Sequence, residues 1–114
     1  MDAPKIIQAI DVQCSDDGIR IVLPSPEKFS FETNDWAQQL YTLHPGTFHY
    51  MTIDLRRYKS VNSILCAGFI HLYRSFHCEQ ANLINVHPNV ESIIKTLQLD
   101  KIFKLEINTQ RHNK

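Results

Sequence analysis

The sequence predicts a single α/β domain with a mostly parallel sheet of four to five strands, an N-terminal antiparallel hairpin and helices packed on the sheet. Strand-like and helix-like segments alternate along the chain, and no linker rich in proline, glycine or serine divides it. A length of 114 residues suits one domain. We therefore expect one domain over residues 1–114, with its core at about 5–107 and a polar tail at 108–114.

The first two strands are expected at residues 5–12 and 19–23, which are rich in isoleucine and valine. Between them, residues 15–18 read Ser-Asp-Asp-Gly, a sequence that favours a tight turn, so the paired acids are interpreted as turn residues. Pro24 ends the second strand because proline cannot donate to a strand ladder. These two strands make the hairpin.

A helix follows the N-cap candidates Thr33, Asn34 and Asp35, and it ends at His44-Pro45-Gly46. Residues 50–55 carry apolar residues on both faces, which favours a central strand. The remaining elements are expected, in order, as a helix at 63–77, a strand at 81–86, a helix opened by His87-Pro88-Asn89 and a strand at 102–107. The buried face of the second helix is expected to carry Leu65, Phe69, Leu72, Tyr73 and Phe76.

Charge and hydropathy argue against two kinds of partner. Twelve Lys and Arg balance twelve Asp and Glu, with no basic block, so we expect no nucleic-acid binding. The longest apolar run, residues 64–70, is far shorter than the roughly 20 residues that span a bilayer, so direct membrane insertion is not expected.

Cysteine usage favours a reducing compartment. Cys14, Cys66 and Cys78 are widely spaced and include no Cys-x-x-Cys pair, so reduced thiols are the simplest account. Residues 1–5 do not begin a signal peptide. The sequence therefore predicts a cytoplasmic protein.

No constellation of residues predicts catalysis, a metal or a cofactor. The six histidines show no metal-ligand spacing, and the three glycines form no phosphate-binding loop. Cys66 near a helix start is either a thiol activated by the helix dipole or an ordinary buried thiol, and the second reading is favoured. We expect no enzyme activity, no metal and no cofactor.

Two positions around the third strand remain of interest. Asp54, near the strand's carboxyl end, is either functional or a residue that caps or pairs the following loop. At the next junction, Asn62 is a competent N-cap and Ser63 takes the first helical position. A phosphate on Ser63 would be tolerated by the helix dipole, although the serine could equally serve only in capping.

Residues 51–55 (Met-Thr-Ile-Asp-Leu), residues 61–63 (Val-Asn-Ser) and the following helix resemble the STAS domain, the sulfate transporter and anti-sigma factor antagonist family. Residues 81–90 are similar to its next strand, proline turn and third helix, and residues 97–103 to its "tGLdkiF" ending. The resemblance covers residues 6–107.

This resemblance implies a non-catalytic bacterial regulator of transcription. Such a module binds an anti-sigma factor resembling a serine kinase, and phosphorylation of a serine in the family's DSSG motif releases the partner. That serine falls on Ser63. The alternative is a constitutive STAS subunit of a larger complex, such as a lipid-transport ABC system, whose partner is a transporter subunit.

The motif departs from the family pattern. Asn62 replaces an Asp, and Ile64 and Leu65 replace the small Ser-Gly pair. These bulky side chains would either obstruct a kinase or form a new hydrophobic contact point. The expected partner-binding residues are Asn62, Ser63, Ile64 and Leu65, together with Phe29 and Phe31 from a predicted loop.

Overall fold

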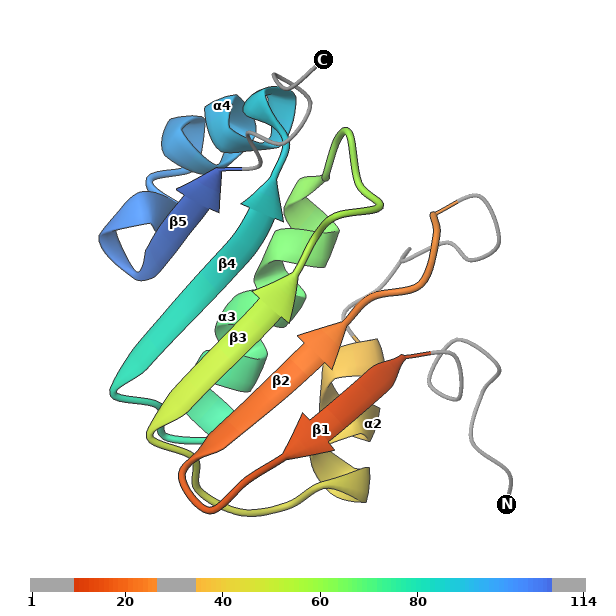
Figure 1. Ribbon diagram of the computed structural model, residues 1–114, viewed down its shortest axis with the longest axis vertical. Helices are drawn as coiled ribbons and strands as arrows, with labels where there is room; N and C mark the ends of the chain where they lie inside the picture. The colour runs from red at the N-terminus through yellow and green to blue at the C-terminus, as the bar shows by residue number, and fades with distance from the viewer. Residues whose placement is uncertain (1–9, 27–34, 108–114) are drawn as a thin grey trace.

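The computed structural model describes residues 10–26 and 35–107 (Figure 1). The strands are β1 (Asp11–Cys14), β2 (Gly18–Val22), β3 (Tyr50–Asp54), β4 (Gln80–Val86) and β5 (Phe103–Ile107). The helices are α2 (Asp35–Leu43), α3 (Ser63–Ser75), α4 (Pro88–Thr96) and the short 3₁₀ helix η1 (Leu99–Lys101). The predictions for residues 5–9, 27–34 and 108–114 concern positions outside the described residues.

The five strands form one sheet in the order β1-β2-β3-β4-β5. β1 pairs antiparallel with β2, whereas the other three pairings are parallel. The expected fold class, a mostly parallel sheet with an N-terminal hairpin, is therefore confirmed. Because β2, β3 and β4 run parallel to one another, their carboxyl ends meet at one edge of the sheet.

The three α-helices among the described residues cover the same face of the sheet. Right-handed crossovers that advance in one direction across the sheet place their helices on one side, and Figure 1 shows α2 and α3 behind the strands. The core lies in that layer, and its buried side chains include Ile53 of β3 and Phe69 and Leu72 of α3. The opposite face of the sheet has no helix among the described residues.

β3 is central, as predicted, but the predicted reason was wrong. Only one of its faces is apolar and covered, through Met51 and Ile53, while Tyr50 on the other face is 47% exposed. Leu55 follows the end of the strand and is buried there. The apolar run therefore extends through a strand and into the core-facing start of a loop.

Several boundaries differ from the prediction for local reasons. β1 continues to Cys14, directly before the predicted turn, where the Ser15 N–H donates to the Gly18 carbonyl at 2.8 Å. α3 stops at Ser75 because His77 takes a left-handed conformation (φ 55°). Gln98, also left-handed, precedes η1, which the sequence pattern did not predict.

Gly68 sets the distance between α2 and α3. A methyl group built at this position would lie 2.4 Å from Cζ2 and 2.6 Å from Cε2 of Trp36. Trp36 in turn packs edge-on against Phe69, with ring centroids 6.2 Å apart. The tryptophan ring thus occupies the space that a side chain at position 68 would need.

We expect Gly68→Ala to lower the free energy of unfolding by about 1–3 kcal/mol, because the added methyl group overpacks the helix interface. Urea denaturation measures this loss. Combining Gly68→Ala with Trp36→Phe removes the clashing atoms, so the double variant should lose less than the two single losses added together. A stabilised Gly68→Ala, as at an ordinary exposed helix position, would contradict this packing.

Candidate functional site

The start of α3 is fixed by a side-chain cap. Asn62 has an extended backbone (φ −118°, ψ 172°), and its Oδ1 accepts the Leu65 N–H at 2.7 Å. The Asn62 carbonyl also accepts the Cys66 N–H at 3.1 Å. Asn62 is therefore the N-cap that the sequence predicted, and the helix begins at Ser63.

The predicted partner-binding residues divide between surface and core. Asn62 and Ser63 are exposed, and the side chain of Ile64 lies beside them with 40% of its surface exposed. Leu65 is only 3% exposed and packs in the core, as its place on the buried helix face requires. The Leu65 side chain therefore contributes almost nothing to the exposed surface at the start of α3. Phe29 and Phe31 lie outside the described residues.

The loop between β3 and α3, residues 55–62, is anchored at its middle. Tyr58 is buried, and its hydroxyl donates to the Pro24 carbonyl at 2.7 Å. Burial raises the pKa of this phenol above its usual range, so the hydroxyl stays protonated as a donor. Arg57 adds a longer contact, from Nη1 to the Leu23 carbonyl at 3.4 Å. The loop is thus tied to the segment that follows β2.

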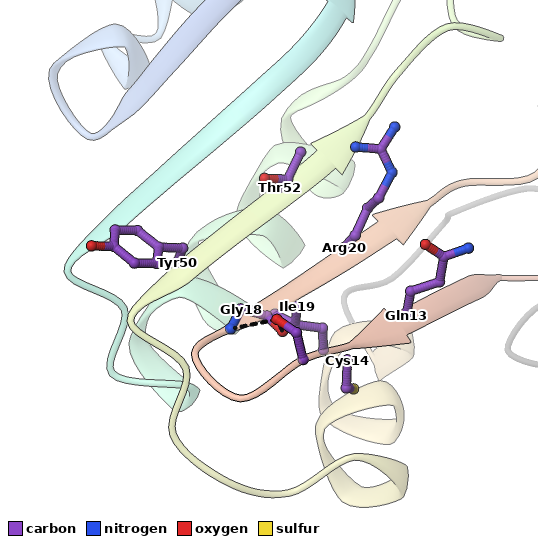
Figure 2. Close-up of a pocket in the computed structure, with 8 residues that line it drawn as sticks. Gln13, Cys14, Gly18, Ile19, Arg20, Tyr50 and Thr52 are labelled. Atoms are coloured by element: carbon purple, nitrogen blue, oxygen red, sulfur yellow. Dashed lines mark hydrogen bonds between the residues drawn. The ribbon is translucent and has the colours of Figure 1, made fainter.

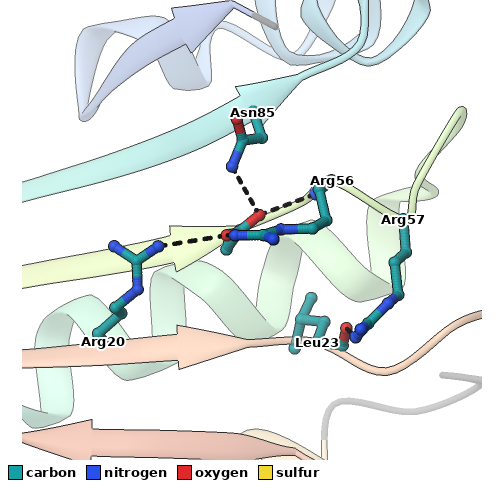
Figure 3. A network of polar contacts seen from close by, with 6 residues as sticks. Arg20, Leu23, Arg56, Arg57 and Asn85 are labelled. Carbon is teal, nitrogen blue, oxygen red and sulfur yellow. Dashed lines mark hydrogen bonds and ion pairs between the residues drawn. The ribbon is translucent and has the colours of Figure 1, made fainter.

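At the carboxyl edge of the sheet, Asp54 collects hydrogen bonds from three segments (Figure 3). Arg56 donates from its backbone N–H to Oδ1 at 3.0 Å and from Nε to Oδ2 at 3.0 Å, and its Nη2 also contacts Oδ2. Asn85 of β4 donates to Oδ1 at 3.1 Å, and Arg20 of β2 reaches Oδ2 at 3.4 Å. The Asp54 side chain is completely enclosed by these groups.

The balance of these contacts keeps Asp54 ionised. Burial by itself would raise the pKa of this carboxyl group. The side-chain hydrogen bonds of Arg56 and Asn85, the Arg56 backbone N–H and the Arg56 charge outweigh burial, and the pKa falls below its ordinary value. Of the two readings of Asp54, the observed contacts match the residue that pairs the following loop.

The partners of Asp54 were not predicted from the sequence. Asn85 reaches it because the β4–β5 register shifts between Leu83 and Val86, and because Asn85 itself is left-handed (φ 55°). Asparagine tolerates this conformation better than most residues, and that tolerance is the one signal present in the sequence. Arg20 is brought near by the parallel register, in which Val22 lies opposite Asp54.

The buried thiols do not form a nucleophilic site. Burial raises the pKa of Cys66 to about 11 and that of Cys78 to about 11, so both are neutral thiols near pH 7. The activated-thiol reading of Cys66 is therefore wrong. Within residues 10–26 and 35–107, no group of three or more His, Cys, Asp or Glu side chains could hold a metal ion.

The uncovered sheet face carries two open hollows. One, of about 350 Å³, lies over β1, β2 and β3 and is lined in part by Gln13, Arg20, Tyr50 and Thr52 (Figure 2). The other, of about 320 Å³, lies over β4 and β5. Both are open toward solvent, unlike the enclosed, largely apolar sites that bind small molecules.

In the part of the chain that the structure describes, no helix has the length and apolarity needed to cross a membrane.

Comparison with known proteins identifies the fold. No protein-family model and no curated protein matches the sequence. The NMR structure of the protein TM1081 aligns with a TM-score of 0.65 and 15% identity, covering 88% of this chain and 82% of that chain. A crystal structure of TM1081 from Thermotoga maritima, provisionally described as an anti-sigma factor antagonist, aligns with a TM-score of 0.63 and 13% identity over 96% and 95% of the two chains.

These alignments span nearly the whole chain at low identity, so they establish architecture. The fold is STAS-like, as the resemblance of the sequence implied.

Replacing Asp54 with Asn should lower the free energy of unfolding at neutral pH by about 2 kcal/mol, since the charge-assisted hydrogen bonds from Arg56 and Arg20 are lost. A lowered pKa means that the folded state gains from ionised Asp54. That gain is complete well above the ordinary value of 3.8 and is lost as the pH falls through the lower folded-state pKa.

The difference between wild type and Asp54→Asn should therefore shrink as urea titrations are moved from neutral to strongly acidic pH. Asp16→Asn, which removes one negative charge at an exposed turn carboxylate, is the matched control for the loss of charge alone. A pH-independent difference for Asp54→Asn would rule out the ion pairs as its cause.

The cap gives a second expectation. Asn62→Ala should cost about 1 kcal/mol of stability because the Leu65 N–H loses its acceptor. Asn62→Asp retains an oxygen at that position and should remain close to wild type. Thermal denaturation of the two variants side by side checks this, and wild-type stability of Asn62→Ala would show that the cap contributes nothing.

Proposed function

We propose that this chain is a non-catalytic protein-binding module that docks a partner through Asn62, Ser63 and Ile64 at the start of α3. The observation that carries the proposal is this exposed turn, capped by Asn62 and anchored by the buried Leu65 beside it. A STAS-like fold supports it, since a solved structure with that fold is provisionally described as an anti-sigma factor antagonist. The proposed setting is the cytoplasm.

Phosphorylation of Ser63 is the proposed control. Ser63 is exposed at the first helical position, where backbone N–H groups of the first turn lack intrahelical acceptors. A phosphate there meets the positive end of the helix dipole, so the fold tolerates it. It would change the charge of the docking surface by about −1.5 to −2 units at neutral pH. The proposed partner of this switched form is an anti-sigma factor of the serine-kinase type.

The exposed Ile64 favours a second candidate. An aliphatic side chain beside the serine suits a permanent contact better than the small residue of the STAS motif does. In this reading the domain is a constitutive subunit of a larger complex, such as a lipid-transport system, and Ser63 is not modified.

We expect Ser63→Asp to weaken the complex with the native partner, purified from cells with tagged chain, at least about tenfold, a loss of 1.4 kcal/mol in binding. Its melting temperature should stay close to wild type, because an acidic group suits the first turn of a helix. Ser63→Thr is the control that retains the hydroxyl group and should bind normally. Unchanged binding by Ser63→Asp would exclude the switch.

Intact-mass measurement separates the two candidates. Chain isolated from its native cells should carry an added mass of about 80 Da, one phosphoryl group, that disappears in Ser63→Ala. Persistence of that mass in Ser63→Ala would place the modification elsewhere, and unmodified chain in a stable complex would favour the constitutive subunit.

A further inference from the structure

Charge is strongly segregated along this chain. The twelve acidic residues are spread over the rest of the sequence, but residues 55–78 contain none, while Arg56, Arg57, Lys59 and Arg74 lie within that stretch. Three of these four cations belong to the loop that leads into α3. The neutral net charge of the chain therefore conceals a locally cationic segment.

The fold adds a fourth cation to this loop. Arg20 projects from β2 toward the same edge of the sheet, where it meets Asp54 beside Arg56 (Figure 3). We call Arg20, Arg56, Arg57 and Lys59 the basic loop surface. Asp54 offsets one of the four charges, but its own side chain is enclosed and offers nothing to a partner.

These cations keep donors available. The side chains of Arg20 and Arg56 are 42% and 51% exposed even while they contact Asp54. Each guanidinium has five N–H donors, of which Asp54 takes one from Arg20 and two from Arg56. Lys59 is exposed as well. The Asp54 contacts hold Arg56 in place, so less side-chain entropy is lost when it binds an anion.

We infer that the basic loop surface binds an acidic segment of the partner protein, adjacent to Ile64; the inference rests on the proposed docking site at the start of α3. Exposed Ile64 lies in the first turn of α3, two positions after the loop, and offers an apolar side chain in the same segment as three of the cations. These features argue against nucleic acid as the ligand. A phosphate backbone offers no apolar group to pack against Ile64, and an extended nucleic-acid site needs a larger cationic surface than four residues.

The basic loop surface also explains how phosphorylation of Ser63 would weaken partner binding. A phosphoryl group on Ser63 would add negative charge beside cations that the acidic segment needs. It would compete with that segment and repel it, so the partner would be released by charge without any change in fold.

The test is an NMR titration of the full chain with an oligoglutamate peptide ending in leucine and with the matched oligoglutamine peptide. The acidic peptide should shift backbone amides of residues 56–64, and added salt should weaken the effect. Arg57→Gln combined with Lys59→Gln should lower the affinity about tenfold. Lys101→Gln changes an exposed lysine of η1, just before the outer strand β5. This variant is the control and should leave binding unchanged.

Equal shifts from the oligoglutamine peptide, or equal loss in Lys101→Gln, would overturn the inference. So would an identical set of shifts from inorganic phosphate at matched ionic strength, or tighter binding of a short single-stranded DNA. If the acidic peptide does not bind while Ser63→Asp still weakens the native complex, the proposed docking site is retained and only the inference of an acidic partner segment is rejected. If Ser63→Asp does not weaken that complex, the proposed docking site itself is rejected, whether or not the peptide binds.

Discussion

The ionised, enclosed Asp54 is the constraint on which the candidate site depends. Its two oxygens bring together Arg20 of β2, Arg56 of the following loop and Asn85 of β4. A carboxylate cut off from water is costly unless its lone pairs are satisfied, so these donors are required by its burial. The same contacts fix Arg56, the second residue of the loop that ends at α3. Placement of the proposed docking surface is thus coupled to the electrostatics of the sheet edge.

The fold could be predicted from the sequence because its signals are local. Alternating apolar residues, turn residues such as Gly18 and prolines beside helix ends define each element within a few positions. Asn62 was predicted as a cap for the same reason, since its acceptor serves an N–H only three residues away. The chief failure was at Tyr50 to Leu55, where composition alone could not distinguish a strand covered on two faces from one covered on a single face.

The site resisted prediction where it depends on register. Arg20 and Asp54 are separated by 34 positions and meet only because β2 and β3 pair in parallel with a particular alignment. Asn85 reaches Asp54 through a left-handed residue at an irregularity in β4. Leu65 was assigned both to a buried helix face and to a contact surface, and only the packing of α3 on the sheet decides between them.

The burial of Leu65 beside the exposed Ser63 has an evolutionary consequence. The segment that resembles the STAS motif is exposed to solvent at residues 62–64 and is buried in the core at Leu65. Substitutions at Asn62, Ser63 or Ile64 would change the proposed docking surface at little cost to folding, provided that the cap persists, whereas position 65 is constrained by volume. The exposed residues can therefore vary while the architecture is retained, and a chain with a divergent motif can still carry an intact fold.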